Sequence, residues 1–240
     1  MGATEGSDAR APFRRAFTPS TRTSDVSLRY VTTNEGKIEE ALEYLDSGVT
    51  QLDYDYTEIQ ADELEPVAAV GAREAFRVAG EPVIVDDAGL FIEELDGFPG
   101  PYSSYVEDTL GVERVGELAR DAGTTRASFR CVLAYCDGDG FEATPEPVDL
   151  GDRRGHDLDA ADRDRAATDE TVAEGDVPVK LFVGSVPGRI VEPRGDGGFG
   201  YDPIFEHDGR TFAEMGADRK NAVSHRGRAL AKFADWYADR

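Results

Sequence analysis

An apolar stretch that runs directly into two adjacent carboxylates constrains the fold of this chain more than any other feature. Pro82 is followed by Val83–Val85, and then come Asp86, Asp87 and a glycine at 89. The apolar residues predict a buried strand that turns at the glycine. We expect the two aspartates at its carboxyl end, where open α/β sheets place ligands. Since adjacent strand residues face opposite sides, one carboxylate can face a cleft and bind Mg²⁺ while the other supports it.

The length and charge of the chain limit its class and its partners. At 240 residues it can form one sizeable α/β domain, or a domain of two lobes. It has 49 acidic and 26 basic residues and a formal net charge of -23, so its general surface repels nucleic acid and we expect no such partner. With only four lysines, the composition suggests adaptation to high salt, where charges are screened within roughly 3 Å at 1 M. An ordinary acidic cytosolic protein is the alternative.

The cysteines and the absence of long apolar runs indicate a cytoplasmic protein without a membrane partner. Cys131 and Cys136 share a predicted strand, and their odd separation sends them to opposite faces, so we expect neither a disulfide nor a metal site. No apolar run approaches a membrane span, and residues 1–27 lack the apolar centre of a secretory signal. We expect 1–27 to be a disordered extension or the result of a start codon placed too early, with a targeting role as the alternative.

Hydrophobic periodicity predicts an α/β domain over 28–240. The expected strands are 28–32, 49–56, 83–86, 90–95, 127–136, 179–186 and 189–192. The expected helices are one that places Ile38, Leu42 and Leu45 on one face, one from 65 to a stop at Gly80, one over 108–122 and one over 220–238. The stretch 143–178 is acidic, has prolines near its ends and shows little periodicity, which predicts a solvated insertion.

The segment 32–37 joins the first strand to its helix and reads Thr-Thr-Asn-Glu-Gly-Lys. Backbone N–H groups at a helix N-terminus attract phosphate, and Lys37 adds a positive charge. Either Thr33 or Asn34 can cap the helix. The segment is not a P-loop, because it lacks the glycine spacing and the following hydroxyl of that motif. An ordinary capped helix with a surface lysine is the alternative.

The segment 195–200 formally matches the dinucleotide-binding pattern GxGxxG. The match is misleading, because Pro203 and the apolar residues after it favour an extended segment instead of the required helix. A glycine-rich loop that presents Phe199 and Asp202 is better suited to stacking on a nucleobase. A tight turn with a core phenylalanine is the alternative.

Two further segments carry candidate polar ligands. His225 and Arg226, near the last helix, are donors suited to a carbonyl on a purine edge. A capped, solvated helix end is the alternative for this pair. Glu58 follows a predicted strand and can supply another oxygen ligand to a hard cation, with an isolated exposed glutamate as the alternative.

Seven motifs, taken in their order, resemble those of the inosine triphosphate pyrophosphatase family. They are 32–37, 58–60, 86–90, 97–103, 199–203, 211–215 and 220–226, so the resemblance covers about 28–237 apart from the acidic insertion. Members hydrolyse non-standard purine nucleoside triphosphates such as ITP, dITP and XTP to the monophosphate and pyrophosphate, with Mg²⁺, before polymerases use them. The resemblance implies an ITPase-like fold with a long mixed β-sheet flanked by helices, two lobes, a central cleft and a homodimer.

The resemblance also implies roles for individual residues. Asp87 is expected to be the general base that activates water, with Glu58 and Asp87 near Mg²⁺ and Asp86 as a supporting group. The expected substrate contacts are Thr32, Thr33, Asn34, Glu35, Gly36, Lys37, Arg73, Ala88, Phe199, Gly200, Tyr201, Asp202, Lys220, His225 and Arg226. Phe199 is expected to stack on the purine, and the residues expected to read its 6-oxo edge are Asp202, His225 and Arg226. Lys37 and Lys220 are expected to hold phosphate or base oxygens.

Two residues depart from the family pattern. Arg73 stands where the family commonly has lysine, and it is expected to grip phosphate with two donors. Ala88 replaces a serine that often follows the aspartate pair, which removes one hydroxyl contact or leaves it to a backbone amide.

The sequence leaves two other functions open. One is a pyrophosphatase for pyrimidine or modified nucleotides, which the residues expected to read a purine edge disfavour. The other is a nucleotide-binding module without turnover. The intact set of carboxylates argues against this second alternative.

Overall fold

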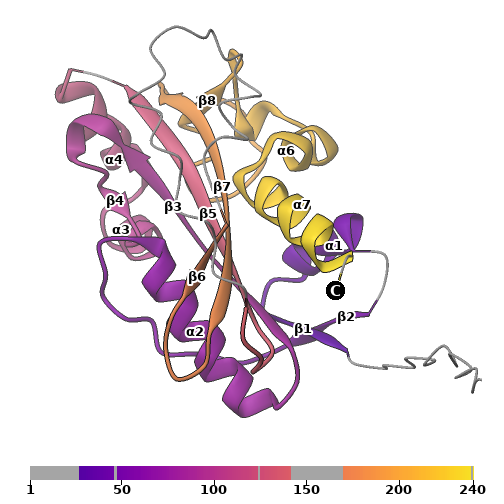
Figure 1. Ribbon diagram of the computed structural model, residues 1–240. Coiled ribbons are helices and arrows are strands. Elements are labelled where there is room, and N and C mark those ends of the chain that lie inside the picture. The colour runs from indigo at the N-terminus through magenta and orange to yellow at the C-terminus, as the bar shows by residue number, and fades with distance from the viewer. Residues whose placement is uncertain (1–26, 46–47, 124, 142–169, 239) are drawn as a thin grey trace, which may run out of the picture.

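The computed structural model describes residues 27–45, 48–123, 125–141, 170–238 and 240, and in this part of the chain nine strands form one mixed sheet (Figure 1). The strands are β1 Leu28–Val31, β2 Val49–Leu52, β3 Val83–Ile92, β4 Pro99–Gly100, β5 Arg126–Cys136, β6 Glu170–Ala173, β7 Val179–Ile190, β8 Phe205–His207 and β9 Arg210–Thr211. Their order is β2-β1-β3-β5-β7-β8-β9, with β4 on β3 and β6 on β7. Only the pairs β1–β2 and β1–β3 are parallel within the described chain.

Helices cover both faces of this sheet. They are α1 Glu35–Tyr44, α2 Leu64–Ala79, α3 Ser103–Leu110, α4 Val112–Asp121, α6 Ala217–Val223 and α7 His225–Ala238, with short 3₁₀ turns at Glu93–Leu95 and Phe212–Glu214. In Figure 1, α2 lies on one side of the long strands, and α1 and α7 lie on the other. The predicted stop at Gly80 is confirmed, since this residue has φ 64° and donates its N–H to the carbonyl of Phe76.

Strand alternation divides the core into clusters on the two faces. In β5, Val132 and Ala134 pack under α2, while Leu133 and Tyr135 pack under α1 and α7. The predicted opposite orientation of the two cysteines is confirmed, because Cys131 and Cys136 belong to these two different clusters. A third cluster surrounds the far ends of the same strands and includes residues of α3, α4, β7 and β8.

The aspartate pair lies in the middle of β3, so the prediction that the strand turns after it was wrong. Asp86 pairs with Leu133 and Asp87 with Val132 of β5, and the ladder continues to Ile92. Gly89 does not make a turn. A Cβ at this position would come within 2.2 Å of the Gly100 carbonyl oxygen, so glycine permits the close approach of β4.

Several predicted boundaries also differ from the structure. The second strand ends at Leu52 instead of 56, and the helix predicted over 108–122 is two helices that meet at Gly111, where φ is 86°. Leu42 was predicted to lie on the buried face of α1 but is 48% exposed. The strands predicted over 179–186 and 189–192 are one strand, β7, which ends at Ile190.

The predictions for 1–26 and for 143–169 lie outside the described residues. The end of the predicted insertion was wrong, because Glu170–Ala173 form β6 and pair antiparallel with β7. Among the helices that the structure describes, none is long and apolar enough to cross a bilayer.

Candidate active site

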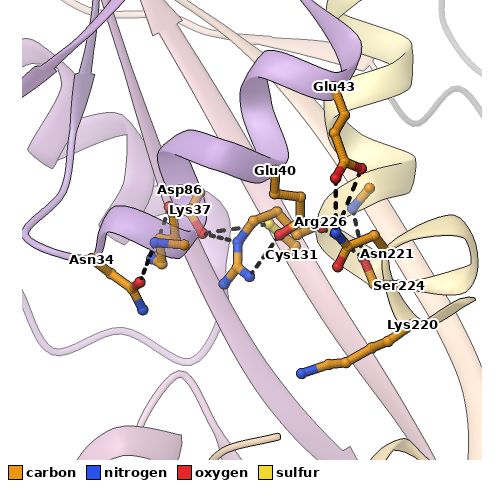
Figure 2. Close-up of polar contacts among 12 residues, drawn as sticks. Asn34, Lys37, Glu40, Glu43, Asp86, Cys131, Lys220, Asn221, Ser224 and Arg226 are labelled. Atoms are coloured by element: carbon orange, nitrogen blue, oxygen red, sulfur yellow. Dashed lines mark hydrogen bonds and ion pairs between the residues drawn. The ribbon is translucent and has the colours of Figure 1, made fainter. Parts of the chain in front are cut away.

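Asp86 is the centre of a buried network of charged side chains between β3, α1 and α7 (Figure 2). Its Oδ1 accepts hydrogen bonds from the Tyr30 hydroxyl at 2.8 Å and from Lys37 Nζ at 2.9 Å. Its Oδ2 accepts one from Arg226 Nε at 2.9 Å. Burial alone would raise the pKa of Asp86, but the two cations hold that pKa well below its usual range. Asp86 is therefore held as an ionised carboxylate between two cations, and its supporting role stays a prediction.

Arg226 connects Asp86 to Glu40 of α1. Arg226 Nη1 lies 3.3 Å from Glu40 Oε2, and the Ser224 hydroxyl donates to Glu40 Oε1 at 3.0 Å. Figure 2 shows the guanidinium between the two carboxylates, and Arg226 is only 8% exposed. Sequence reasoning missed Glu40, because a glutamate three residues after Lys37 resembles a solvated helix position. The predicted contact of Arg226 with a purine edge stays a prediction.

Asp87 faces the opposite side of β3 and has an oxygen without a partner. Its Oδ1 accepts the N–H of Ala88 at 3.0 Å, whereas its Oδ2 is buried and has no hydrogen bond within the described chain. Burial and the carboxylates of Asp86 and Glu58 raise the pKa of Asp87 to about 7. A buried carboxylate that titrates near neutral pH is suited to accept a proton or to bind a cation.

Glu58 lies in the exposed segment between β2 and α2 and contributes to the field at Asp87. In the described residues, no group of three or more histidine, cysteine or acidic side chains is arranged to hold a metal. Magnesium ions usually take only one or two carboxylates and complete their coordination with water and phosphate oxygens. The unpartnered oxygen of Asp87, with Glu58 nearby, fits this type of site.

In the segment 32–37, hydrogen bonds from backbone N–H groups to side chains of the same segment stabilise the start of helix α1. The Thr32 hydroxyl accepts the N–H of Asn34 at 3.1 Å, and the Asn34 side chain caps α1 by accepting the N–H of Gly36 at 2.9 Å. Thr33 and Glu35 are exposed. The predicted cap is confirmed for Asn34. The Lys37 ammonium donates its hydrogen bond to Asp86. Contact of this segment with phosphate stays a prediction.

Phe199, Asp202 and Lys220 form a second cluster of contacting residues, called here the Phe199 corner. Asp202 is 3% exposed, and its Oδ2 accepts the N–H of Phe199 at 2.8 Å and a hydrogen bond from Lys220 Nζ at 2.6 Å. The same ammonium lies 4.2 Å from the ring centroid of Phe199. Phe199 is 61% exposed, so the alternative of a core phenylalanine is wrong and the ring is available for stacking.

The neighbours of this corner hold its shape. Gly200 has φ 58°, and the buried Tyr201 donates its hydroxyl to the carbonyl of Ser103 at 2.9 Å. His225 is buried and stacks on Phe129, with ring centroids 4.8 Å apart. Burial, with the charges of Arg226 and Lys220, lowers the pKa of His225 well below its usual value, and its Nδ1 has no partner in the described chain. A neutral ring with a free nitrogen can read a polar ligand edge.

A family model described as the Ham1 family matches residues 28–149 and 153–236. This chain belongs to the Ham1 family. It is 41% identical over 218 residues to a dITP/XTP pyrophosphatase of Methanopyrus kandleri, covering 88% of this chain and 96% of the relative. It is 40% identical over 215 residues to the protein of the same name from Thermococcus kodakarensis, covering 87% and 96%. The solved HAM1 protein of Coxiella burnetii has a TM-score of 0.67 and 28% identity, covering 90% of this chain and all of that one.

These likenesses confirm the family resemblance and the long mixed sheet flanked by helices.

The contacts of Arg73 differ from those expected. Arg73 donates hydrogen bonds to the backbone carbonyls of Ala173 at 2.8 Å, Glu174 at 2.8 Å and Val177 at 2.7 Å. Its guanidinium thus fastens the segment that links β6 to β7. The predicted grip of Arg73 on phosphate has no support in these contacts. At Ala88, the backbone N–H bonds to the Asp87 carboxylate.

Proposed function

We propose that this Ham1 protein hydrolyses non-standard purine nucleoside triphosphates, ITP, dITP and XTP, to the nucleoside monophosphate and pyrophosphate. The chain is a hydrolase of nucleoside triphosphate anhydrides, like its relatives named dITP/XTP pyrophosphatase, which it matches along almost their whole length. The observation that carries the proposal is the buried oxygen of Asp87 that has no partner among the described residues, in a carboxyl whose pKa is about 7. This group is available for acid–base chemistry at neutral pH.

Asp87 would act as the general base. It takes a proton from a water molecule whose oxygen forms a new bond to phosphorus, while the bond between the α and β phosphates breaks and pyrophosphate leaves. Asp86 supports this step by keeping its own negative charge, which helps to raise the pKa of Asp87. The buried bonds from Tyr30, Lys37 and Arg226 hold Asp86 in position.

The cofactor we propose is Mg²⁺, held by Asp87 and Glu58. When bound, the ion would neutralise charge on the triphosphate. The described residues favour a hard cation, since the free oxygen belongs to a carboxylate and the nearby acidic group is also an oxygen donor. Lys37 and Lys220 are the proposed contacts to phosphate or base oxygens, together with the helix start at 32–36.

Recognition of the purine is proposed for the corner around Phe199. The exposed ring offers a face for stacking. Asp202, His225 and Arg226 are the proposed readers of the 6-oxo edge, where a carbonyl accepts hydrogen bonds that the amino group of adenine cannot accept. Of these, His225 has an unpartnered ring nitrogen within the described structure.

The substrate panel gives the direct test. We expect the protein, in molar KCl with Mg²⁺, to form IMP and pyrophosphate from ITP and to act on XTP, while it leaves ATP, GTP and dTTP nearly untouched. Products would be separated by chromatography and pyrophosphate measured by a coupled assay. Equal turnover of dTTP would support the pyrimidine alternative. Tight ITP binding without pyrophosphate release, by protein shown to be folded in that salt, would support a binding module instead.

We also propose that the protein is a cytoplasmic, salt-adapted homodimer. Its two subunits would contact each other through α3 and the loop before it. Large apolar side chains are exposed there: Tyr105 by 69%, Leu110 by 43%, Phe98 by 39% and Tyr102 by 37%. A cluster of exposed aromatic side chains is typical of a protein interface.

We expect Tyr105→Glu to reduce the mass measured by sedimentation equilibrium from that of a dimer to that of a monomer, because it buries a charge in the proposed interface. Val78→Glu is the matched control, since Val78 is an exposed apolar residue on α2, outside this surface. A wild-type monomer at micromolar concentration, or a dimer unaffected by Tyr105→Glu, would remove this surface from consideration.

A further inference from the structure

The 3₁₀ turn that follows β9 contacts the loop 195–202, called here the Phe199 loop, at two points. Both hydrogen bonds are made by the backbone of Ala213, which is buried. Its carbonyl accepts the N–H of Gly197 at 3.2 Å, and its N–H donates to the carbonyl of Asp202 at 3.2 Å. These two partners lie on either side of the aromatic residue in the sequence. The ring is therefore presented by a short stretch of chain whose two ends are bonded to the same residue.

The glycines at the start of the Phe199 loop allow it to lie directly against this turn. A Cβ on Gly195 would come within 2.6 Å of the Ala213 carbonyl carbon, and one on Gly197 within 2.9 Å of the Ala213 carbonyl oxygen. Gly195 also has φ 82°, a conformation that residues with a side chain disfavour. The glycine spacing that formally matches a dinucleotide-binding pattern therefore serves close packing on the turn.

Thr211 joins the turn to the residue that precedes the loop. Thr211 is fully buried, and its hydroxyl donates a hydrogen bond to the carbonyl of Arg194 at 2.8 Å. Glu214 Oε2 accepts the N–H of Thr211 at 2.8 Å, which completes a capping box at the start of the turn. The same carboxylate oxygen lies 3.8 Å from Arg194 Nε. Since Arg194 is followed directly by the first glycine, these contacts anchor the Phe199 loop where the chain enters it.

The Phe199 ring depends on these backbone contacts, because packing gives its side chain little support. The ring is 61% exposed, and the N–H of Phe199 bonds to the Asp202 carboxylate at 2.8 Å. If the loop were free, a ligand that stacks on the ring would lose affinity to the entropy of ordering the chain. A loop that is fixed before the ligand arrives avoids this cost.

We propose that Thr211 and Glu214 are positioning residues for recognition of the substrate base, which act by fixing the Phe199 loop before the nucleotide binds. The inference rests on the proposed function, because it requires a purine base stacked on this ring. Neither residue touches the base, since the Thr211 hydroxyl and the Glu214 carboxylate are both engaged in holding the turn. The proposed phosphate site at Asp87 lies on a different element, β3. Binding of the phosphate chain alone should therefore not depend on Thr211.

The test compares a ligand that carries the base with one that lacks it. In an Asp87→Asn background that blocks turnover, we expect Thr211→Val to raise the Kd for ITP, measured by calorimetry, by about tenfold. The Kd for inorganic tripolyphosphate should change by less than about twofold. Thr211→Ser retains the hydroxyl and is expected to restore ITP binding. Thr50→Val is the matched control, because it removes a threonine hydroxyl that is bonded to Arg29 on the distant strand β2, and we expect neither Kd to change.

A double-mutant cycle identifies the route of the effect. We expect Phe199→Ala to raise the Kd for ITP by about tenfold or more, because it removes the stacking face. Adding Thr211→Val to Phe199→Ala should then cause less than about twofold further loss, since the loop no longer presents a ring. Losses that add in full, or an equal loss of ITP and tripolyphosphate binding, would overturn the proposal.

A second variant covers the case in which Thr211→Val fails to fold, as judged by circular dichroism in molar KCl. Glu214→Ala removes the acceptor of the Thr211 N–H at an exposed position. We expect it to raise the Kd for ITP by about threefold and to leave the Kd for tripolyphosphate unchanged. Unchanged binding of ITP by folded Glu214→Ala would then contradict the positioning role.

The outcomes separate this inference from the proposed function. If the wild type releases pyrophosphate and Thr211→Val binds ITP as its parent does, the positioning role is wrong and the function stands. If the wild type binds ITP without turnover, the function is wrong, and the two Kd values of Thr211→Val in the wild-type background still decide the positioning role. If the wild type does not bind ITP, both are wrong.

Discussion

Asp87→Asn is expected to lower kcat for ITP by roughly 10² to 10⁴, the range that a positioned general base contributes. The asparagine side chain keeps the size of the aspartate but cannot accept the proton from water. The change is measured as pyrophosphate release at saturating ITP and Mg²⁺. Asp121→Asn is the control, because Asp121 is an exposed aspartate at the end of α4, outside the proposed dimer surface. Full activity of Asp87→Asn would remove Asp87 from the reaction.

The same substitution is expected to make the folded protein more stable at alkaline pH. The pKa of Asp87 is about 7 in the folded state and about 4 in an unfolded chain, so the folded state binds the proton more tightly. Stability therefore falls as the pH rises from about 4 to about 7, and the full penalty applies above 7. Without Mg²⁺, we expect Asp87→Asn to increase the free energy of unfolding by roughly 2 to 4 kcal/mol at pH 8 and to have little effect at pH 4. A pH-independent difference in urea unfolding would contradict this.

Arg226→Ala is expected to reduce the free energy of unfolding by roughly 3 to 5 kcal/mol at pH 7, because it leaves two buried carboxylates, Asp86 and Glu40, without their common cation. Urea unfolding in molar KCl measures this effect. Arg114→Ala is the matched control, since the ion pair of Arg114 with Glu117 is exposed on α4, and we expect little change there.

The pH dependence of the Arg226 effect has a definite sign. The pKa of Asp86 is well below its unfolded value, so its stabilising contribution is present above about pH 4 and is lost as the pH falls further. The penalty of Arg226→Ala should therefore shrink in acid, when Asp86 of the variant can take a proton. A penalty that is equal at pH 3 and pH 7 would show that Arg226 acts through packing and not through its charge.

Local sequence patterns predicted correctly those elements in which the local conformational preference matches the tertiary structure. The alternation in 127–136 has one period and two buried faces, and it gave β5 almost to the residue. The stop at Gly80 depends on one left-handed residue. Asp86, Asp87 and Gly89 instead read as the end of a strand, because aspartate and glycine are rare inside strands. The pairing of β3 with β5 along its length overrides this local preference, and one sequence alone does not reveal that pairing.

The site was predictable as a set of residue types but not as a set of contacts. The order of the motifs singled out Asp87, Lys37 and Asp202 as candidates, and their roles at the site stay predictions. Glu40 was missed because its partner Arg226 lies 186 residues further along the chain. The role predicted for Arg73 was based on its charge alone. Its observed contacts are with the backbone of residues 173–177, and the sequence does not reveal that this distant segment lies beside α2.

Because β3 runs uninterrupted past both aspartates, its strand register decides the proposed catalytic geometry as well as stability. The ladder between β3 and β5 extends from Val83 opposite Cys136 to Ile92 opposite Ala127, and the two carboxylates lie inside it. A slip of one residue would turn every side chain of the strand to the other face. It would exchange the carboxylate that is locked by cations for the one that titrates near neutrality. If Asp87 is the general base as proposed, damage to this ladder at a distance from Asp87 is expected to abolish activity in a protein that still contains both aspartates.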